Sequence, residues 1–258
     1  MDLNLAKRFF VVTGAGSGFG RAIAERLLDE GATVLAVART ESVLLSFQKM
    51  FPSDLQIIAG DVSERQTQER IIAACSNRFV DGVLINAGGP PAKPFLETSL
   101  DDWDTAYNLL LRWKVSFCHK IIPVFQKQGY GRLLFIESVS VKQAVDQLVL
   151  SNSLRLAVVG FVKSLAKDIA DQNITLNILA PGYHDTAAMK RLFERKAYTN
   201  NSSVDEARKE LIHQIPVGRL GSADELAVLA TWLLSPLSGF VTGQTISHDG
   251  GLVQGNLG

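Results

Sequence analysis

The chain has 258 residues, of which 47% are hydrophobic and 20% are charged, and its 26 basic residues balance its 26 acidic residues. This share of apolar residues is typical of a folded protein with one sizeable core, and it excludes intrinsic disorder. A protein that binds nucleic acid normally carries a basic surplus, which this chain lacks. We therefore expect a globular protein that binds no nucleic acid.

The N-terminal sequence and the cysteine content indicate the compartment. Residues 1–8 lack the basic-then-apolar order of a signal peptide, and no uncharged apolar run approaches the roughly 20 residues of a membrane helix. The two cysteines, Cys75 and Cys118, are too few for a disulfide framework. We expect a cytoplasmic protein that does not associate with a membrane.

Short apolar segments alternate with helical patterns along the chain. The expected strands are residues 9–12, 33–38, 55–59, 82–86, 132–137, 174–179 and 244–247. The clearest helical patterns are residues 21–30, 100–128, 150–171 and 223–234. Continuous apolar strands that alternate with amphipathic helices indicate parallel βαβ units. We predict one α/β domain over residues 1–258, with a Rossmann-type, doubly wound sheet of about seven mostly parallel strands flanked by helices.

One segment interrupts this alternation. Residues from Pro181 to about Gln214 separate the sixth expected strand from the helix at 223–234 and contain no strand pattern. Such long excursions are usually functional, and this one leaves the carboxyl end of a strand, where open α/β sheets bind ligands. We expect a substrate lid at about 182–215 that contains two short helices. Its larger apolar side chains fit an apolar substrate or ordinary helix packing, and they are Met189, Leu192, Phe193 and Tyr198.

Glycines occur at alternate positions directly after the first strand, in the sequence T-G-A-G-S-G-F-G over residues 13–20. A backbone without Cβ atoms lets a pyrophosphate lie against amide N–H groups at a helix N-terminus. A tight turn alone would need one or two glycines, so four of them predict a phosphate cradle. The residues that we assign to it are Gly14, Gly16, Ser17, Gly18, Phe19 and Gly20.

The T-G-x-x-x-G-x-G spacing resembles the short-chain dehydrogenase/reductase superfamily. Further stretches resemble the pair that contacts adenine in that family, its N-A-G motif, and the P-G-x-x-x-T stretch that flanks the nicotinamide. In this chain they are Asp61-Val62, Asn86-Ala87-Gly88, and Pro181-Gly182 with Thr186. The H-D-G-G sequence at 248–251 resembles the terminus of β-ketoacyl-reductase-like members. The resemblance implies a nicotinamide cofactor at these residues.

The end of the second expected strand bears on the choice of cofactor. A carboxylate there would bind the ribose hydroxyls of NAD(H) and repel a 2′-phosphate. This chain has Ala38 at that position, followed by Arg39, whose guanidinium can bind a phosphate. We predict that NADP(H) is preferred over NAD(H). The alternative is that Arg39 is an ordinary solvated loop residue.

The family resemblance also identifies four catalytic positions. Ser138 matches the serine that orients the substrate carbonyl. Thirteen residues later, Ser151 occupies the position of the family's tyrosine, and Arg155 occupies that of its lysine. Leu110 stands where the family has a helical asparagine, with Asn108 two residues away. The resemblance therefore implies an atypical branch with an incomplete catalytic tetrad.

The replaced residues change the expected chemistry. A serine hydroxyl is a much weaker acid than a phenol, and an arginine is permanently protonated, although Arg155 can still hold ribose hydroxyls. Loss of general acid catalysis costs about 10²–10⁴-fold in rate, which slows a reaction without abolishing it. Candidate replacement acids are Lys142 and Tyr183, with His184 beside the latter. The alternatives are that Lys142 is an ordinary exposed loop lysine and that Tyr183 and His184 only pack within the lid.

These observations lead to two hypotheses about function. The first is an NADP(H)-dependent oxidoreductase of the carbonyl reductase or alcohol dehydrogenase type, similar to 3-oxoacyl reductases. The second is a protein that binds NADP(H) with little or no turnover, as a sensor or partner subunit. The spacing of the four histidines indicates no metal site. The family resemblance implies a homodimer or homotetramer, and Leu109, Trp113 and Phe117 are compatible with either such contacts or core packing.

Overall fold

The computed structural model describes residues 1–255, apart from the side chains of residues 187, 188 and 191. They form one seven-stranded sheet in the order β3-β2-β1-β4-β5-β6-β7, with every pairing parallel. The strands are β1 (Phe9–Thr13), β2 (Thr33–Ala38), β3 (Leu55–Ala59), β4 (Gly82–Ile85), β5 (Gly131–Ile136), β6 (Ile174–Pro181) and β7 (Thr245–His248). The predicted doubly wound sheet is confirmed.

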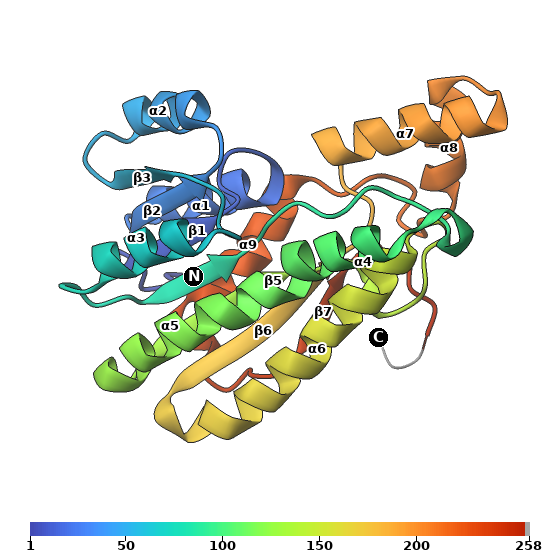
Figure 1. The fold of residues 1–258 in the computed structure, drawn as a ribbon. Coiled ribbons are helices and arrows are strands. Elements are labelled where there is room, and N and C mark those ends of the chain that lie inside the picture. Colours follow the sequence, from blue (N-terminus) through green and yellow to red (C-terminus); the bar gives the residue numbers. More distant parts are fainter. Residues whose placement is uncertain (256–258) are drawn as a thin grey trace.

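Helices cover both faces of the sheet (Figure 1). One face is covered by α1 (Gly18–Asp29), α2 (Glu41–Met50) and α9 (Ala223–Leu234). The other face is covered by α3 (Arg65–Cys75), α4 (Leu100–Tyr107), α5 (Trp113–Gln128) and α6 (Val149–Ile169). The two remaining α-helices, α7 (Ala187–Asn200) and α8 (Val204–His213), lie beyond the carboxyl ends of the strands.

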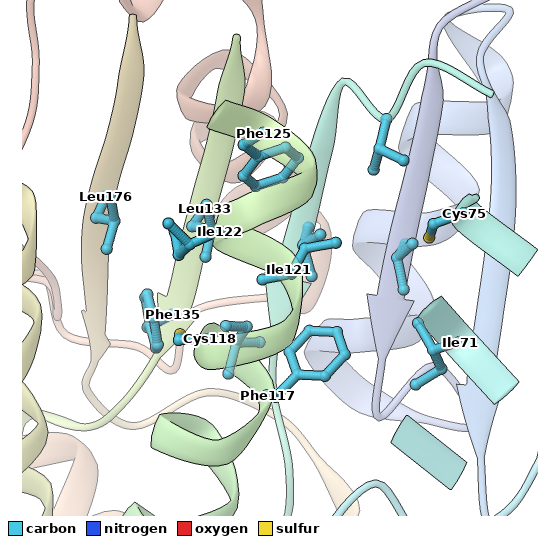
Figure 2. Close-up of a cluster of buried hydrophobic side chains, with 14 of the residues drawn as sticks. Ile71, Cys75, Phe117, Cys118, Ile121, Ile122, Phe125, Leu133, Phe135 and Leu176 are labelled. Atoms are coloured by element: carbon cyan, nitrogen blue, oxygen red, sulfur yellow. The ribbon is translucent and has the colours of Figure 1, made fainter. Parts of the chain in front are cut away.

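Each strand contributes to two hydrophobic clusters, because successive side chains point to opposite faces. In β1, Phe9 and Val11 pack with α3, α5 and α6, whereas Phe10 and Val12 pack with α1 and α9. Figure 2 shows the first cluster, in which aromatic and branched side chains of α5 lie against β5 and β6. This two-sided burial explains why the strand sequences are continuously apolar.

Both cysteines belong to that first cluster (Figure 2). Cys75 and Cys118 are free and buried, and burial raises the pKa of their thiols to about 11 and about 12. They pack as small hydrophobic side chains. Trp113 and Phe117 are buried in the same cluster, so core packing accounts for their apolar character.

The single helix expected over residues 100–128 is interrupted. A π-helical stretch, Asn108–Arg112, separates α4 from α5. The indole N–H of Trp113 donates to the carbonyl oxygen of Leu109 at 2.7 Å, which provides a partner for a carbonyl in this irregular turn. Such π-turns inside helices occur frequently at functional sites. Leu110 is buried at this turn, and Lys114 follows one helical turn later.

By length and composition alone, one stretch of the described residues, Val149–Gln172, is apolar enough to cross a membrane. Its buried side chains include Val158, Val162 and Ala166, which pack in the core against the sheet. Core helices of soluble proteins pass the same test, so this stretch is weak grounds for a membrane span.

The two helices expected between residues 182 and 215 are present as α7 and α8. They form a small hydrophobic cluster of their own, in which Phe193 packs with Leu211 and Ile215. The guanidinium of Arg195 on α7 donates to the carbonyl oxygen of Ala92, in the loop after β4. The excursion therefore has its own core and reaches across to the loop that follows the central strand.

Candidate functional site

The site lies where the sheet order reverses, because β1 pairs with β2 on one side and with β4 on the other. Open α/β sheets bind ligands at this point, beyond the carboxyl ends of the strands. The buried Thr13 hydroxyl donates to the carbonyl oxygen of Asn86 at 2.8 Å and accepts the Asn86 amide N–H at 2.8 Å. This side chain fixes the N-A-G motif beside the glycine turn.

The glycine turn is packed too closely for side chains at two of its positions. Gly14 has φ +66°, and a Cβ there would lie 2.7 Å from the Asn86 side-chain nitrogen. A Cβ on Gly20 would lie 2.3 Å from the Gly14 carbonyl oxygen. Ser17, at the N-cap of α1, is exposed and its side chain makes no capping hydrogen bond in the described structure. The turn therefore exposes backbone N–H groups at a helix N-terminus, which suits a phosphate.

The adenine side of the expected site lies beside this turn. A Cβ on Gly16 would contact the Cβ of Ala38 at 3.2 Å, so the turn lies against the end of β2. Arg39 follows Ala38 and is exposed. After β3, Val62 is buried, and the Asp61 carboxylate accepts hydrogen bonds from Ser63.

The nicotinamide side of the expected site is formed by the end of β6. Pro181 is the last residue of that strand, and the Gly182 N–H donates to the carbonyl oxygen of His248 at 3.0 Å. A Cβ on Gly182 would lie 2.8 Å from the Cβ of Asp249, so this position also needs a glycine. The Thr186 side chain caps α7 by accepting the N–H of Met189.

The structure brings the expected catalytic serine and the two replacement residues to neighbouring elements. Ser138 follows β5, is partly exposed, and accepts a hydrogen bond from the N–H of Ser140 at 3.2 Å. In α6, the Arg155 Nε donates to the Ser151 Oγ at 3.0 Å. The i, i+4 spacing thus places Ser151 and Arg155 on one helix face.

Two charged residues that the sequence analysis did not single out join this group. Glu137, between β5 and Ser138, has a fully buried side chain. Its Oε2 pairs with Arg155 Nη1 at 2.9 Å, and its Oε1 pairs closely with the Nζ of Lys114 on α5. Burial lowers the pKa of Lys114, whereas the Glu137 carboxylate opposes that shift.

A signal for this cluster was present in the sequence. Glu137 is a charged residue directly after an apolar strand, and Lys114 lies in an otherwise apolar helix face. Charged side chains are almost never fully buried unless they are paired, so two such residues in buried patterns indicate a mutual partner. Asn108 belongs to a different environment, since it is exposed and its side chain bonds to Asp104.

The candidate replacement acids lie in different places. Lys142 is partly buried in the loop after β5. Tyr183 is partly buried against the α7–α8 cluster. Burial and the nearby Asp146 carboxylate raise the pKa of Tyr183, which makes its phenol a weaker acid than a free one.

His184 is buried and bonded on both sides of its ring. Its Nδ1 lies 3.1 Å from the carbonyl oxygen of Gly182, and its Nε2 lies 2.9 Å from the His248 Nδ1. A carbonyl only accepts, so His184 carries its proton on Nδ1 and its Nε2 accepts from His248. The ring also packs edge-on against Phe19 of the glycine turn. Burial lowers the pKa of His184.

A cavity of about 340 Å³ opens beside this histidine pair, between the end of β6 and the end of β7. Its lining includes Tyr183, Arg219, Glu225 and Asp249. No group of three or more His, Cys, Asp or Glu side chains that could hold a metal ion occurs within the described part of the chain.

Comparison with known families agrees with the fold and the glycine turn. Residues 14–253 match the family described as enoyl-(acyl carrier protein) reductase. The match spans most of the chain, so the chain belongs to this family of short-chain dehydrogenases/reductases. Its relatives are oxidoreductases that act on carbonyl or alcohol groups.

Two relatives are similar over nearly their whole length. The short-chain reductase protein NovJ of Streptomyces niveus is 31% identical over 247 residues, which cover 93% of this chain and 92% of the relative. The 3-oxoacyl-[acyl-carrier-protein] reductase FabG of Aquifex aeolicus is 30% identical over 258 residues, which cover 98% of this chain and all of the relative.

Solved structures resemble the chain just as fully. YwfH, described as an NADPH-dependent reductase involved in bacilysin biosynthesis, has a TM-score of 0.90 and 26% identity, and the likeness covers 97% of this chain and 100% of YwfH. A variant of actinorhodin polyketide ketoreductase with NADPH has a TM-score of 0.91 and 28% identity, and it covers 96% and 98% of the two chains.

Proposed function

We propose that this protein is an NADP(H)-dependent oxidoreductase that interconverts a carbonyl and an alcohol. The observation that carries the proposal is the group Ser138, Ser151 and Arg155, which lies at the same edge of the sheet as the glycine turn. Polar donors beside a phosphate cradle suit a carbonyl substrate and a nicotinamide cofactor. We further propose a 3-oxoacyl-reductase-like chemistry, in line with the named relatives.

The glycine turn fits a dinucleotide. Gly14 and Gly20 leave no room for Cβ atoms, and the exposed Ser17 hydroxyl and backbone N–H groups remain available to phosphates. Asn86, Ala87 and Gly88 would hold the cofactor at the end of β4, and Pro181, Gly182 and Thr186 would hold its nicotinamide half. Asp61 and Val62 would contact the adenine.

Arg39 supports the preference for NADP(H). It is exposed directly after Ala38, at the end of β2 and beside the glycine turn. A guanidinium at this place suits a 2′-phosphate, and no carboxylate occupies position 38 to repel it. Two similar proteins agree with this choice, because YwfH is described as NADPH-dependent and the actinorhodin ketoreductase variant as a structure with NADPH.

The catalytic roles follow from the chemistry of each side chain. Ser138 would donate its hydroxyl hydrogen to the substrate carbonyl oxygen, and Arg155 would hold ribose hydroxyls. Ser151 and Arg155 stand in for the family's tyrosine and lysine, so neither supplies the proton at neutral pH. The nicotinamide supplies the hydride when bound. The proton would come from solvent, from Tyr183 in the lid, or from Lys142 in the loop after β5.

We propose a small-molecule substrate with an apolar part, enclosed by the lid at residues 182–215. We also propose a cytoplasmic homodimer or homotetramer that associates with neither nucleic acid nor membranes. The second candidate function is a cofactor-binding sensor or partner subunit, which is favoured by the replaced tyrosine and lysine positions, Ser151 and Arg155.

Cofactor titration followed by a substrate panel separates these two functions. We expect NADPH to bind more tightly than NADH and to be consumed with one or more ketones or 3-oxoacyl thioesters. Tight NADPH binding with no consumption above background at high protein concentration would favour the sensor. Failure to bind either cofactor would contradict both.

A further inference from the structure

Three charged side chains lie together in the interior, behind the serines of the site. The side chains of Glu137, Lys114 and Arg155 are 0%, 2% and 10% exposed. They come from the end of β5, the start of α5 and the second turn of α6. Buried ion pairs are costly to desolvate, and well-packed apolar residues in the same volume are often more stabilising. Their presence beside the site therefore suggests a purpose other than stability.

The Arg155 guanidinium is held from two directions. Its Nε donates to the Ser151 Oγ at 3.0 Å, and its Nη1 donates to the Glu137 Oε2 at 2.9 Å. Its Nη2 points toward the loop after β4, where a Cβ on Gly89 would lie 3.0 Å away. That loop follows the N-A-G motif at the proposed nicotinamide half of the site. Ser151 and Glu137 thus hold two nitrogens of the guanidinium, and the third nitrogen faces the loop after β4.

Lys114 holds the Glu137 carboxylate at its second oxygen. It pairs with the other Glu137 oxygen, so the carboxylate bridges two cations and cannot rotate away from Arg155. The groups that face Lys114 from the elements around it are Glu137, Arg155 and Cys118. With Lys114 protonated, the cluster keeps a net positive charge next to a site for an anionic cofactor.

We propose that Glu137, braced by Lys114, is a positioning residue that holds the Arg155 guanidinium against the ribose next to the nicotinamide. This inference rests on the proposed function. It also gives a reason for an arginine at position 155. The planar guanidinium has three nitrogens, which can bond Ser151, bond Glu137 and reach the end of β4 at the same time, whereas a lysine has only one nitrogen. Since the Ser151 oxygen accepts from Arg155, its own hydrogen is free to donate to the substrate.

Two variants disturb the position of Arg155 while keeping the net charge of the cluster. Glu137→Asp shortens the carboxylate by one methylene, and Lys114→Met with Glu137→Gln removes one charge of each sign. Lys120→Met serves as the matched control, because Lys120 lies in the same helix as Lys114 but is partly exposed and outside the cluster. Each protein is titrated with NADPH and, separately, with 2′,5′-ADP, which lacks the nicotinamide ribose.

We expect both cluster variants to bind NADPH about tenfold more weakly, because a charged hydrogen bond is lost, and to bind 2′,5′-ADP as the unmodified protein does. A misfolded variant would lose both ligands, so the fragment controls for folding. A cluster variant that still binds 2′,5′-ADP is folded. If such a variant binds NADPH as tightly as the unmodified protein does, Glu137 does not position Arg155. If the unmodified protein binds neither ligand, the proposed function itself fails.

Discussion

The Ser151 hydroxyl oxygen accepts a hydrogen bond from the Arg155 guanidinium. A hydroxyl in this setting donates a hydrogen bond well, but it gives up a proton far less readily than a phenol does. The substrate oxygen would therefore be stabilised by hydrogen bonds from Ser138 and Ser151, and its proton would arrive more slowly from solvent. We expect a slower enzyme than relatives with a phenolic acid, by about 10²–10⁴-fold.

Ser138→Ala tests the carbonyl-binding role. Removal of a preorganised donor to the reacting oxygen typically costs about 10²–10³-fold in turnover. We expect a loss of this order with an unchanged NADPH dissociation constant, measured by steady-state kinetics and fluorescence titration. Ser164→Ala on the exposed side of α6 is the matched control and should retain full activity. Equal rates for Ser138→Ala and the unmodified protein would remove Ser138 from the site.

Arg39→Ala tests the cofactor preference. Loss of a guanidinium–phosphate contact should weaken NADPH binding by about tenfold or more, since hydrogen bonds between charged groups contribute about 1.5–3 kcal/mol. NADH has no 2′-phosphate, so its affinity should stay the same. Isothermal titration with both cofactors measures the difference. An equal change for the two cofactors would mean that Arg39 does not contact the phosphate.

The sequence predicted contacts within one helix better than contacts between residues on different elements. The shared face of Ser151 and Arg155 was predicted because i, i+4 spacing is a local property of helices. The pairing of Glu137 with Lys114 joins residues 23 positions apart on different elements. It depends on how α5 packs against β5, which hydrophobic periodicity does not specify.

Among the elements, the glycine turn was the most predictable, because its glycines are required by close approach of backbone atoms. The turn between α4 and α5 was the least predictable. Residues 100–128 have one continuous helical pattern, and its periodicity does not indicate the π-helical stretch Asn108–Arg112. Lys114 lies two residues after this stretch, in the first turn of α5, where it pairs with Glu137.

Gly20→Ala tests the glycine turn as an element. The added Cβ would lie 2.3 Å from the Gly14 carbonyl oxygen, so the turn must shift. Overpacking of this kind costs about 1–3 kcal/mol, and we expect NADPH affinity to fall by about tenfold or more. Gly160→Ala is the matched control in α6, where a Cβ meets nothing within 4 Å. It should raise stability by about 0.5–1 kcal/mol and leave NADPH binding unchanged.

The equal numbers of acidic and basic residues give the protein no net charge that would attract an anionic cofactor. The attraction would have to be local, and the proposed contributors are Arg39, exposed directly after β2, and Arg155 on α6. Lys114 is buried next to Arg155 and pairs with the same carboxylate, Glu137. Net neutrality and a charged binding site are therefore compatible.

His184 predicts how the stability of the molecule depends on pH. Burial lowers its pKa, so below about pH 6.5 the unfolded chain binds more protons than the folded one. This contribution is fully present above that pH and is lost as the pH falls, by up to about 1.4 kcal/mol per pH unit. We expect His184→Asn to reduce the acid sensitivity seen in urea unfolding between pH 7 and pH 5.

His213→Asn is the control for that experiment, because His213 is exposed on α8. Its unfolding free energy should follow the pH as in the unmodified protein. If His184→Asn and His213→Asn both kept the full acid sensitivity, the stability change would have to come from other groups.

We propose that this site transfers a hydride to a carbonyl carbon although Ser151 replaces the family's tyrosine, and transfer of deuterium from the cofactor to the product tests this proposal. NADPH deuterated at the transferring position is incubated with each carbonyl of the substrate panel, and the products are analysed by mass spectrometry. We predict one deuterium on the carbinol carbon of at least one product, at a rate that falls in Ser138→Ala. Tightly bound NADPH that yields no deuterated alcohol with any carbonyl of the panel would contradict the claim.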